Sequence, residues 1–304
     1  MSTITYMTFN LLYTVINMDK LPTISVCILV NKDWSKLRDF ILSVIDFADE
    51  IIIADRGSSG KKISEIIKEI SKNHNIKIEL YHYENPVNEE IHFGKAKNFA
   101  MRKATKDYII ALDADEIPSE EFKKNIKTFL RTKKPVVASV VRIDELIPHL
   151  IERVERIVKN GKNVFYGESN NYIIHEQFVH NHKTERFDPV VWHSQKETHW
   201  LQKPEQRLFL IVLEVERAKK IKSFMGHFIR GVWLFQFKFK KVYFKQKIYK
   251  DGLVGFKFAF MRASHDLLVE LLTGLKPKEG YEYWKDSKWK SRIEKYKKEF
   301  NFSE

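Results

Sequence analysis

The chain contains one cysteine, Cys27, among 304 residues. No disulfide can form within the chain, which excludes a small disulfide-stabilised secreted domain and favours a reducing compartment. Cys27 lies inside an apolar run, where a lone thiol is typical of a small core residue rather than of a nucleophile.

Long hydrophobic runs are also missing. No apolar stretch reaches the roughly 20 residues that a membrane-spanning helix requires. The first twenty residues have neither a basic start nor a small-residue cleavage site, so they do not read as a signal peptide. We therefore expect residues 1–21 to be an N-terminal extension that precedes the folded domain.

Excess positive charge is confined to one part of the chain. Residues 217–304 hold 22 of the 53 Lys and Arg but 9 of the 40 Asp and Glu, which leaves 31 residues of each sign in the rest. The last third therefore carries the whole net charge of +13. This asymmetry predicts an anionic partner for that region: lipid headgroups, nucleic acid or a phosphorylated substrate.

Buried strands alternate with amphipathic helices in the first 130 residues, as in a doubly wound α/β sheet. The expected strands are 24–30, 50–54, 76–83 and 108–112. The expected helices are 34–47, 62–72, 94–104 and one that Ser119 caps. The chain is long enough for one such domain with a helical appendage.

The pattern is weaker after residue 135. Short strands are expected at 136–142, 165–166, 172–174, 190–192 and 207–212. Aromatic residues at four-residue spacing after Gly226 predict a helix, and residues 252–275 predict another. We expect a sheet domain over residues 22–225 and a helical, basic and aromatic region over residues 226–304.

Polar side chains follow several of the expected parallel strands. Asn31 and Asp33 follow the first strand, Asp55 follows the second, and Asp113 and Asp115 follow the fourth. In a doubly wound sheet, ligands bind beyond the carboxyl ends of the strands. The sequence therefore predicts a nucleotide site at this edge.

The sharpest motif is Asp113-Ala114-Asp115. Two carboxylates separated by one small residue can bind Mg²⁺ or Mn²⁺ and leave positions open for phosphate oxygens. The same residues could instead form an acidic turn at the start of the next helix, where Asp and Glu are favoured.

Four segments in order resemble the family 2 glycosyltransferases of the GT-A fold, and among them the lipopolysaccharide-core type. They are Ile28-Leu29-Val30-Asn31-Lys32-Asp33, then residues 48–58 around Asp55, then Gly94-Lys95-Ala96-Lys97-Asn98-Phe99-Ala100, and Leu112-Asp113-Ala114-Asp115-Glu116. The resemblance implies a mostly parallel α/β sheet that binds a nucleotide-diphosphate-sugar donor.

The resemblance also implies individual roles. Asp55 and Asp113 would contact the nucleotide, and Asp115 would hold the divalent metal together with Asp113. The residues expected near the nucleotide or its phosphates are Asn31, Asp33, Lys95, Lys97 and Asn98. Two positions depart from the family's pattern: Asp33 stands where a Glu is usual, and Arg56 where Ser or Asp is frequent.

Sugar transfer with inversion needs a carboxylate that removes the proton of the acceptor hydroxyl. The resemblance favours Glu214, although Leu213 replaces the histidine that often precedes it. Other candidates are Glu145, Glu168, Glu176 and Glu205.

Histidines offer a further metal ligand. His227 matches a histidine downstream of the motif in the related enzymes, where it could contact the metal or diphosphate, although a lone histidine is more often structural. The patch of His175, Glu176, His180 and His182 lacks the i, i+4 histidine pair of a zinc helix and has no cysteine partner.

Aromatic and basic residues interleave between Phe228 and Lys250. This combination suits a helix on an anionic membrane surface. A helix packed on the domain with its lysines outward, or a nucleic-acid-binding segment, has the same composition.

The sequence thus predicts a metal-assisted glycosyltransferase at the cytoplasmic face of the cell membrane, acting on a glycan or lipid-linked acceptor in cell-envelope biosynthesis. A sugar-1-phosphate nucleotidyltransferase would share the sheet but would need a glycine-rich first loop, which Asn31-Lys32-Asp33-Trp34 does not supply. A nucleic-acid-binding protein that uses the basic tail, with steeply salt-dependent binding, is the other alternative.

Overall fold

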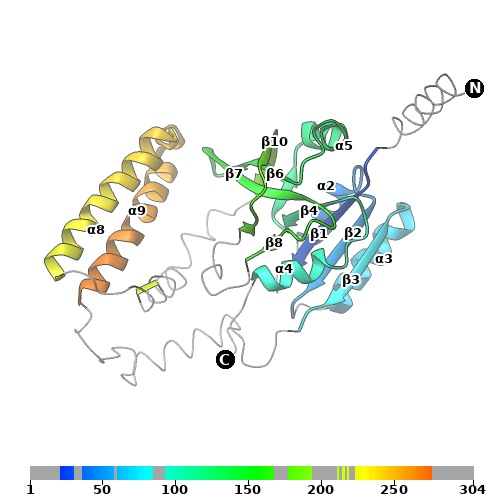
Figure 1. The fold of residues 1–304 in the computed structure, drawn as a ribbon, viewed down its shortest axis with the longest axis horizontal. Helices are drawn as coiled ribbons and strands as arrows, with labels where there is room; N and C mark the ends of the chain where they lie inside the picture. Colours follow the sequence, from blue (N-terminus) through cyan, green and yellow to red (C-terminus); the bar gives the residue numbers. More distant parts are fainter. Residues whose placement is uncertain are drawn as a thin grey trace, which may run out of the picture.

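An eight-stranded sheet organises most of the chain in this computed structural model (Figure 1). The structure describes residues 21–30, 36–57, 60–84, 93–167, 177–193, 211, 214–215, 218 and 223–275. The strand order is β3-β2-β1-β4-β7-β6-β10-β5. The expected α/β fold with a mostly parallel sheet and a helical C-terminal region is confirmed.

The first half of the sheet is parallel. It consists of β1 (Ile24–Val30), β2 (Glu50–Asp55), β3 (Lys77–His82) and β4 (Tyr108–Asp113), with β1 in the middle between β2 and β4. β1 and β2 are apolar and almost wholly buried because helices cover both of their faces.

Two layers of helices enclose this half. Helices α2 (Leu37–Val44), α3 (Gly60–Asn73) and α5 (Glu120–Lys133) pack on the face that carries Val26, Ile28 and Ile51. Helix α4 (Phe93–Met101) packs on the opposite face, against Cys27 and Ile52. Cys27 is therefore a core residue, and burial raises the pKa of its thiol.

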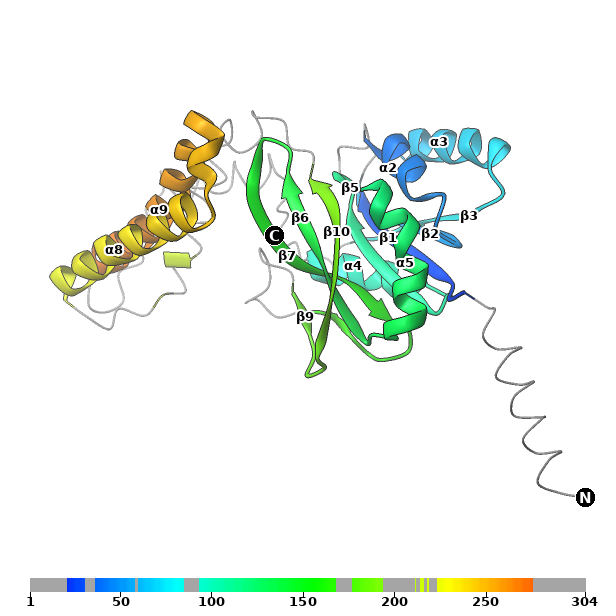
Figure 2. The ribbon, with the colours of Figure 1, turned by 90° about the horizontal axis from the view of Figure 1, so that it is seen from above.

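Antiparallel strands extend the sheet beyond β4. β7 (Ile147–Lys159) pairs antiparallel with β4 and with β6 (Val137–Asp144), and β10 (Thr184–His193) runs parallel to β6. The short β5 (Glu116–Pro118) closes the edge, and β8 (Phe165–Tyr166) with β9 (Phe178–Val179) forms a separate pair. Figure 2 shows the long β7 crossing beside α4.

The C-terminal part is a helical hairpin, residues 223–275, that lies to one side of the sheet (Figures 1 and 2). It comprises α8 (Phe224–Phe239), the π-helical turn η2 (Lys240–Lys245), the 3₁₀ turn η3 (Ile248–Asp251) and α9 (Gly252–Leu275). Val242, Ile248 and Ala259 pack with Ile147 and Leu150 of β7. Within the described ranges, no helix is both long and apolar enough to cross a bilayer.

Two expectations about strands need correction. Residues 147–159 form the longest strand, which the sequence did not predict because charged residues interrupt its apolar positions. Ile211, the one described residue of the strand expected at 207–212, is helical instead. The strand expected at 172–174 lies outside the described residues.

Candidate active site

Asp55 and Asp113 lie on either side of the carboxyl end of β1. Val30 pairs with Asp55, and Leu29 pairs with Asp113. Two strand spacings separate the two aspartates, which corresponds to roughly 10 Å between their backbones. Asp55 is buried, and its carboxylate lies 3.9 Å from Nδ1 of His82 at the end of β3. The predicted convergence at this edge of the sheet is thus present for these two residues.

Two cations hold the Asp113 carboxylate. The Lys97 Nζ is 2.6 Å from Oδ1, and the Arg156 guanidinium is 2.8 Å from Oδ2. Burial disfavours the ionised carboxyl, but Lys97 and Arg156 outweigh burial and keep the pKa of Asp113 below its ordinary value. Asp113 is therefore an anion with two fixed cations beside it, and about a third of its side chain is exposed.

Sequence reasoning missed Arg156, which connects the motif to β7. Its guanidinium donates to both oxygens of the buried Glu116, at 2.9 and 2.7 Å, as well as to Asp113. Glu116 also accepts from the Asp113 backbone N–H at 3.1 Å. The sequence did not indicate Arg156 because residues 147–159 were not predicted to form a strand. The Arg156 side chain reaches the motif only because β7 pairs with β4 and β6.

Sequence reasoning also missed His193, at the end of β10. Its Nε2 lies 3.5 Å from Asp115, and its Nδ1 lies 3.3 Å from Asp144. Burial disfavours the protonated ring, but hydrogen bonds to Asp115 and Asp144 outweigh burial and raise the pKa of His193 to about 9. A histidine directly after the expected strand 190–192 was the only available signal.

Helix α4 supplies the remaining predicted residues at this edge. Lys97 is buried and extends to Asp113, 5.3 Å above the Tyr166 ring. The buried Asn98 exchanges two hydrogen bonds with the Tyr166 backbone, at 2.9 and 2.8 Å, so it fixes β8 against α4. Lys95 lies one turn earlier on the same helix. Asn31 and Asp33 lie outside the described residues.

A divalent metal ion can bind the carboxylate of Asp115 more readily than that of Asp113. Both Asp113 oxygens already face cations, whereas His193 faces one Asp115 oxygen, Oδ2, and the Asp115 side chain is 40% exposed. In the part of the chain that the structure describes, no three His, Cys, Asp or Glu side chains converge to hold a metal by themselves. A single hard carboxylate leaves most coordination positions of Mg²⁺ or Mn²⁺ to diphosphate oxygens.

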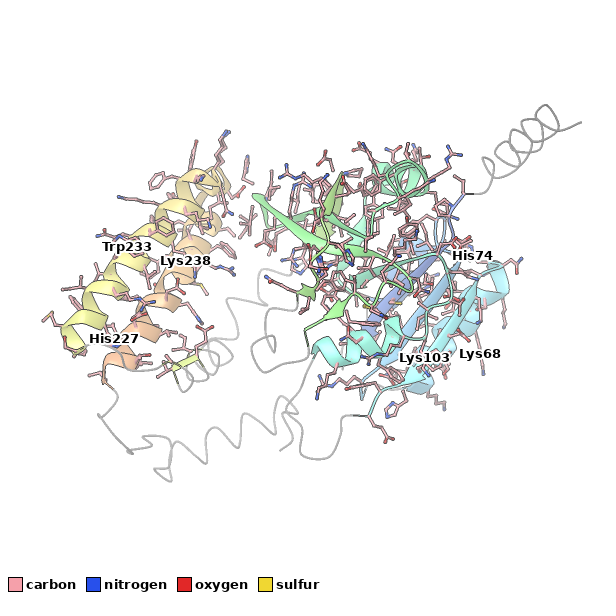
Figure 3. All side chains as sticks on the ribbon, viewed as in Figure 1. Lys68, His74, Lys103, His227, Trp233 and Lys238 are labelled. Carbon is pink, nitrogen blue, oxygen red and sulfur yellow. The ribbon has the colours of Figure 1, made fainter. Side chains whose placement is uncertain are left out.

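Glu214 and His227 lie in other surroundings. Glu214 forms an ion pair with His265 of α9, at 3.1 Å, and its side chain is 41% exposed. His227 is buried within the hairpin, where its Nδ1 is 2.7 Å from Glu270 of α9 (Figure 3). The described contacts bring neither residue to Asp113 or Asp115.

A protein-family model matches the part of the chain that contains this site. The glycosyl transferase family 2 model matches residues 25–244, which include the strand ends, the Asp113-Ala114-Asp115 motif and β7. This chain belongs to glycosyl transferase family 2. The matched range contains the carboxyl ends of β2 and β4, where Asp55 and Asp113 lie.

Curated relatives of this family 2 chain carry the same general description. It is 28% identical over 174 residues to the glycosyltransferase SunS of Bacillus phage SPbeta and to the prophage-derived SunS of Bacillus subtilis strain 168. The match covers 56% of this chain and 38% of the length of each relative.

Solved structures show a more distant likeness. TarS from S. aureus in complex with UDP-GlcNAc is 12% identical with a TM-score of 0.42, and the match covers 64% of this chain and 66% of TarS. The mannosyltransferase PcManGT from Pyrobaculum calidifontis, in complex with GDP-Man and Mn²⁺, is 16% identical with a TM-score of 0.34, over 42% and 37% of the two chains. Neither likeness is close enough to identify a substrate.

Proposed function

We propose that the chain transfers a sugar from a nucleotide-diphosphate-sugar donor, with inversion at the anomeric carbon. The observation that supports this most is the position of Asp55 and Asp113 on either side of the β1 end, with Lys97 and Arg156 fixed on Asp113. Carboxylates can bind the hydroxyl and N–H groups of a nucleoside, and the two cations provide positive charge for its diphosphate.

Asp115, with Asp113 next to it, is the residue that we propose for a divalent metal. When bound there, the metal would neutralise the departing nucleoside diphosphate as a Lewis acid. His193 and Asp144 orient the Asp115 side chain for this role. For His227 we propose a structural role, because its ring is buried against Glu270.

The donor and the metal can be tested together by thermal shift. UDP-, GDP-, dTDP- and CMP-sugars are each added with and without Mn²⁺. A ligand at a hundred times its Kd stabilises the fold by about 2.7 kcal/mol, which raises the midpoint measurably. We expect one nucleotide class to raise it, with an additional shift in Mn²⁺ that Asp115→Asn removes. The matched control is Asp188→Asn, an exposed carboxylate of β10.

If no nucleotide sugar raises the midpoint, the proposed donor class is wrong. If the donor shift is the same with and without Mn²⁺, the metal role of Asp115 is wrong, while the donor proposal stands.

Glu214 remains our proposal for the general base. Glu214→Gln should then lower kcat at least about a hundredfold with little change in KM, because the acceptor hydroxyl keeps its proton. His265→Asn distinguishes this role from a structural one, since it breaks the ion pair but leaves the carboxylate. If both variants lower activity equally, Glu214 acts through its contact with α9 and not as a base.

The acceptor that we propose is a glycan or lipid-linked glycan of the cell envelope, modified at the cytoplasmic face of the membrane. The support for this part is the basic and aromatic hairpin, since cations and aromatic rings suit an anionic interface.

A further inference from the structure

Large hydrophobic side chains are exposed mainly on the hairpin. Among the described residues, 17 large hydrophobic side chains are exposed, and 13 of them belong to residues 223–275. Exposed apolar side chains gathered in this number on one part of a molecule indicate an interaction site. The most exposed of the 13 are Leu253 at 66%, Ile229 at 62%, and Met225, Trp233 and Leu275 at 59%.

Helix α9 has one side toward the sheet domain and another side away from it. Val254 and Phe258 pack on the cluster that includes β7, and His265 pairs with Glu214. These positions repeat at i, i+4 and i+11 and therefore share a helix face. Leu253 and Phe256 lie outside this face, and both are exposed.

Helix α8 extends the exposed side. Phe235 of α8 contacts Phe260 of α9 at a ring-centroid distance of 5.6 Å, and Phe239 of α8 contacts Phe256 of α9 at 5.9 Å. The two helices therefore pack against each other through these aromatic rings. On α8, Met225, Ile229 and Trp233 repeat every four residues and form an exposed stripe of their own. We call the following six residues the exposed face: Met225, Ile229, Trp233, Leu253, Phe256 and Phe260.

The hairpin carries an excess of positive charge. Residues 223–275 contain nine Lys and Arg against three Asp and Glu. All three carboxylates are already paired: Asp251 with His149, Asp266 with Lys238, and Glu270 with His227 and Arg230. The cations without a carboxylate partner in the described chain are Lys240, Lys241, Lys245, Lys247, Lys250, Lys257 and Arg262. Five of these seven lie in the turn between the helices or directly beside it.

We propose that the exposed face of the hairpin docks on a lipid bilayer with anionic headgroups, without crossing it. Apolar side chains would enter the interface, while the unpaired cations of the turn lie at the level of the headgroups. A second copy of this chain fits less well, because a two-fold interface would place two hairpins with the same positive excess against each other. This inference rests on one part of the proposed function, namely that the acceptor is bound to the membrane.

The test is co-sedimentation of the full chain with phosphatidylcholine vesicles that contain or lack phosphatidylglycerol. The first variant replaces three exposed side chains, Ile229→Ser, Trp233→Ser and Leu253→Ser. The second replaces Lys240, Lys245 and Lys257 by Gln. The matched control is Ile151→Ser with Val179→Ser, which removes two hydrophobic side chains of the sheet domain that are 57% and 53% exposed.

We expect binding to anionic vesicles that weakens as salt increases. The serine variant should lower the partition coefficient at least about tenfold. The glutamine variant should lower it roughly a hundredfold at low salt, since each basic residue near an anionic surface contributes about 1 kcal/mol. The control should bind like the unaltered chain.

Equal binding of the serine variant and the unaltered chain would overturn the proposal, as would absence of binding to anionic vesicles. The proposal would also be overturned if the chain is a dimer in solution and the serine variant is a monomer, because the exposed face would then bind a second copy. The donor thermal shift should be unchanged in both variants, so a failure of the membrane proposal is distinguishable from a failure of the proposed transferase activity.

Discussion

Arg156 illustrates how much one side chain can determine in this protein. It is buried and bridges Glu116 to Asp113, so it joins β7 to the loop that carries the motif. Arg142 is also near Glu116, at 3.4 Å, but cannot replace the bidentate contact.

Arg156→Met should lower the free energy of unfolding by about 3 kcal/mol, because Glu116 would remain charged and buried without its principal partner. The measurement is urea denaturation of the purified protein. Adding Glu116→Gln should recover part of the loss, since the uncompensated charge is then gone. Lys68→Met, at an exposed position of α3, is the control and should have little effect. An equal loss in the single and double variants would contradict the electrostatic explanation.

Glu50 predicts a pH dependence of stability. Its buried carboxylate accepts from Ser25 Oγ at 2.6 Å and from the backbone N–H and hydroxyl of Thr105 at 2.6 and 2.7 Å. Burial disfavours the anion, but these hydrogen bonds outweigh burial and lower the pKa of Glu50 below its ordinary value of 4.5. A lowered folded-state pKa contributes stability that is present above pH 4.5 and lost as the pH falls further.

Glu50→Gln should therefore cost about 2 kcal/mol of unfolding free energy at neutral pH. The difference from the unaltered protein should shrink as the pH falls from 4.5 through the lowered pKa of folded Glu50, because the carboxylate then becomes protonated. Thermal or urea unfolding across this pH range measures it. A constant difference at all pH values would show that the charge of Glu50 is not the cause.

At the scale of elements, the turn between η3 and α9 depends on glycine. A Cβ at Gly255 would lie 1.9 Å from the Ile248 carbonyl oxygen, too close for any side chain. The backbone at Ile248 can approach α9 this closely only because residue 255 lacks a Cβ.

Gly255→Ala should therefore open the turn. We expect amide exchange in residues 240–260 to become faster while the protection of β1 and β4 stays unchanged, because the sheet core is separate from this packing. Arg262→Ala, on an exposed part of the same helix, is the control. Unchanged exchange in the turn would contradict the steric argument.

For the whole molecule, the question is how the hairpin is attached to the sheet domain. The Asp251 side chain is only 4% exposed and faces His149 of β7, with a distance of 2.5 Å between its Oδ1 and the ring Nδ1. Val242, Ile248 and Ala259 add apolar packing against Ile147 and Leu150 of β7. Among the described residues, the attachment thus combines this apolar packing with the Asp251–His149 pair.

Asp251→Asn should weaken the attachment without affecting the donor site. We expect trypsin to cleave within residues 238–262 several times faster, since local opening exposes the lysines of the turn. The thermal shift with donor should remain that of the unaltered chain. Asp266→Asn, which interrupts a pair inside the hairpin, is the comparison. Equal cleavage of Asp251→Asn and the unaltered chain would show that apolar packing alone holds the hairpin.

The sequence by itself determined the parallel half of the sheet and part of the site. β1, β2 and β4 are short apolar runs. β2 and β4 each end on an aspartate, and the order of the strands along the chain places Asp55 and Asp113 at one edge. Ser119 was recognisable as a helix cap, and its hydroxyl does accept from the Phe122 N–H. Local periodicity suffices for these features because each depends on neighbouring residues.

Tertiary structure alone decided the partners of the motif. β7 has no clean alternation, so Arg156 became a buried partner of Asp113 only through pairing with β4 and β6. His193 reaches Asp115 because β10 lies beside β5 and β6. His227 resembled a metal ligand in sequence, yet it faces Glu270 across the hairpin. Contacts between residues far apart in the chain depend on strand order and helix packing, which local sequence patterns do not encode.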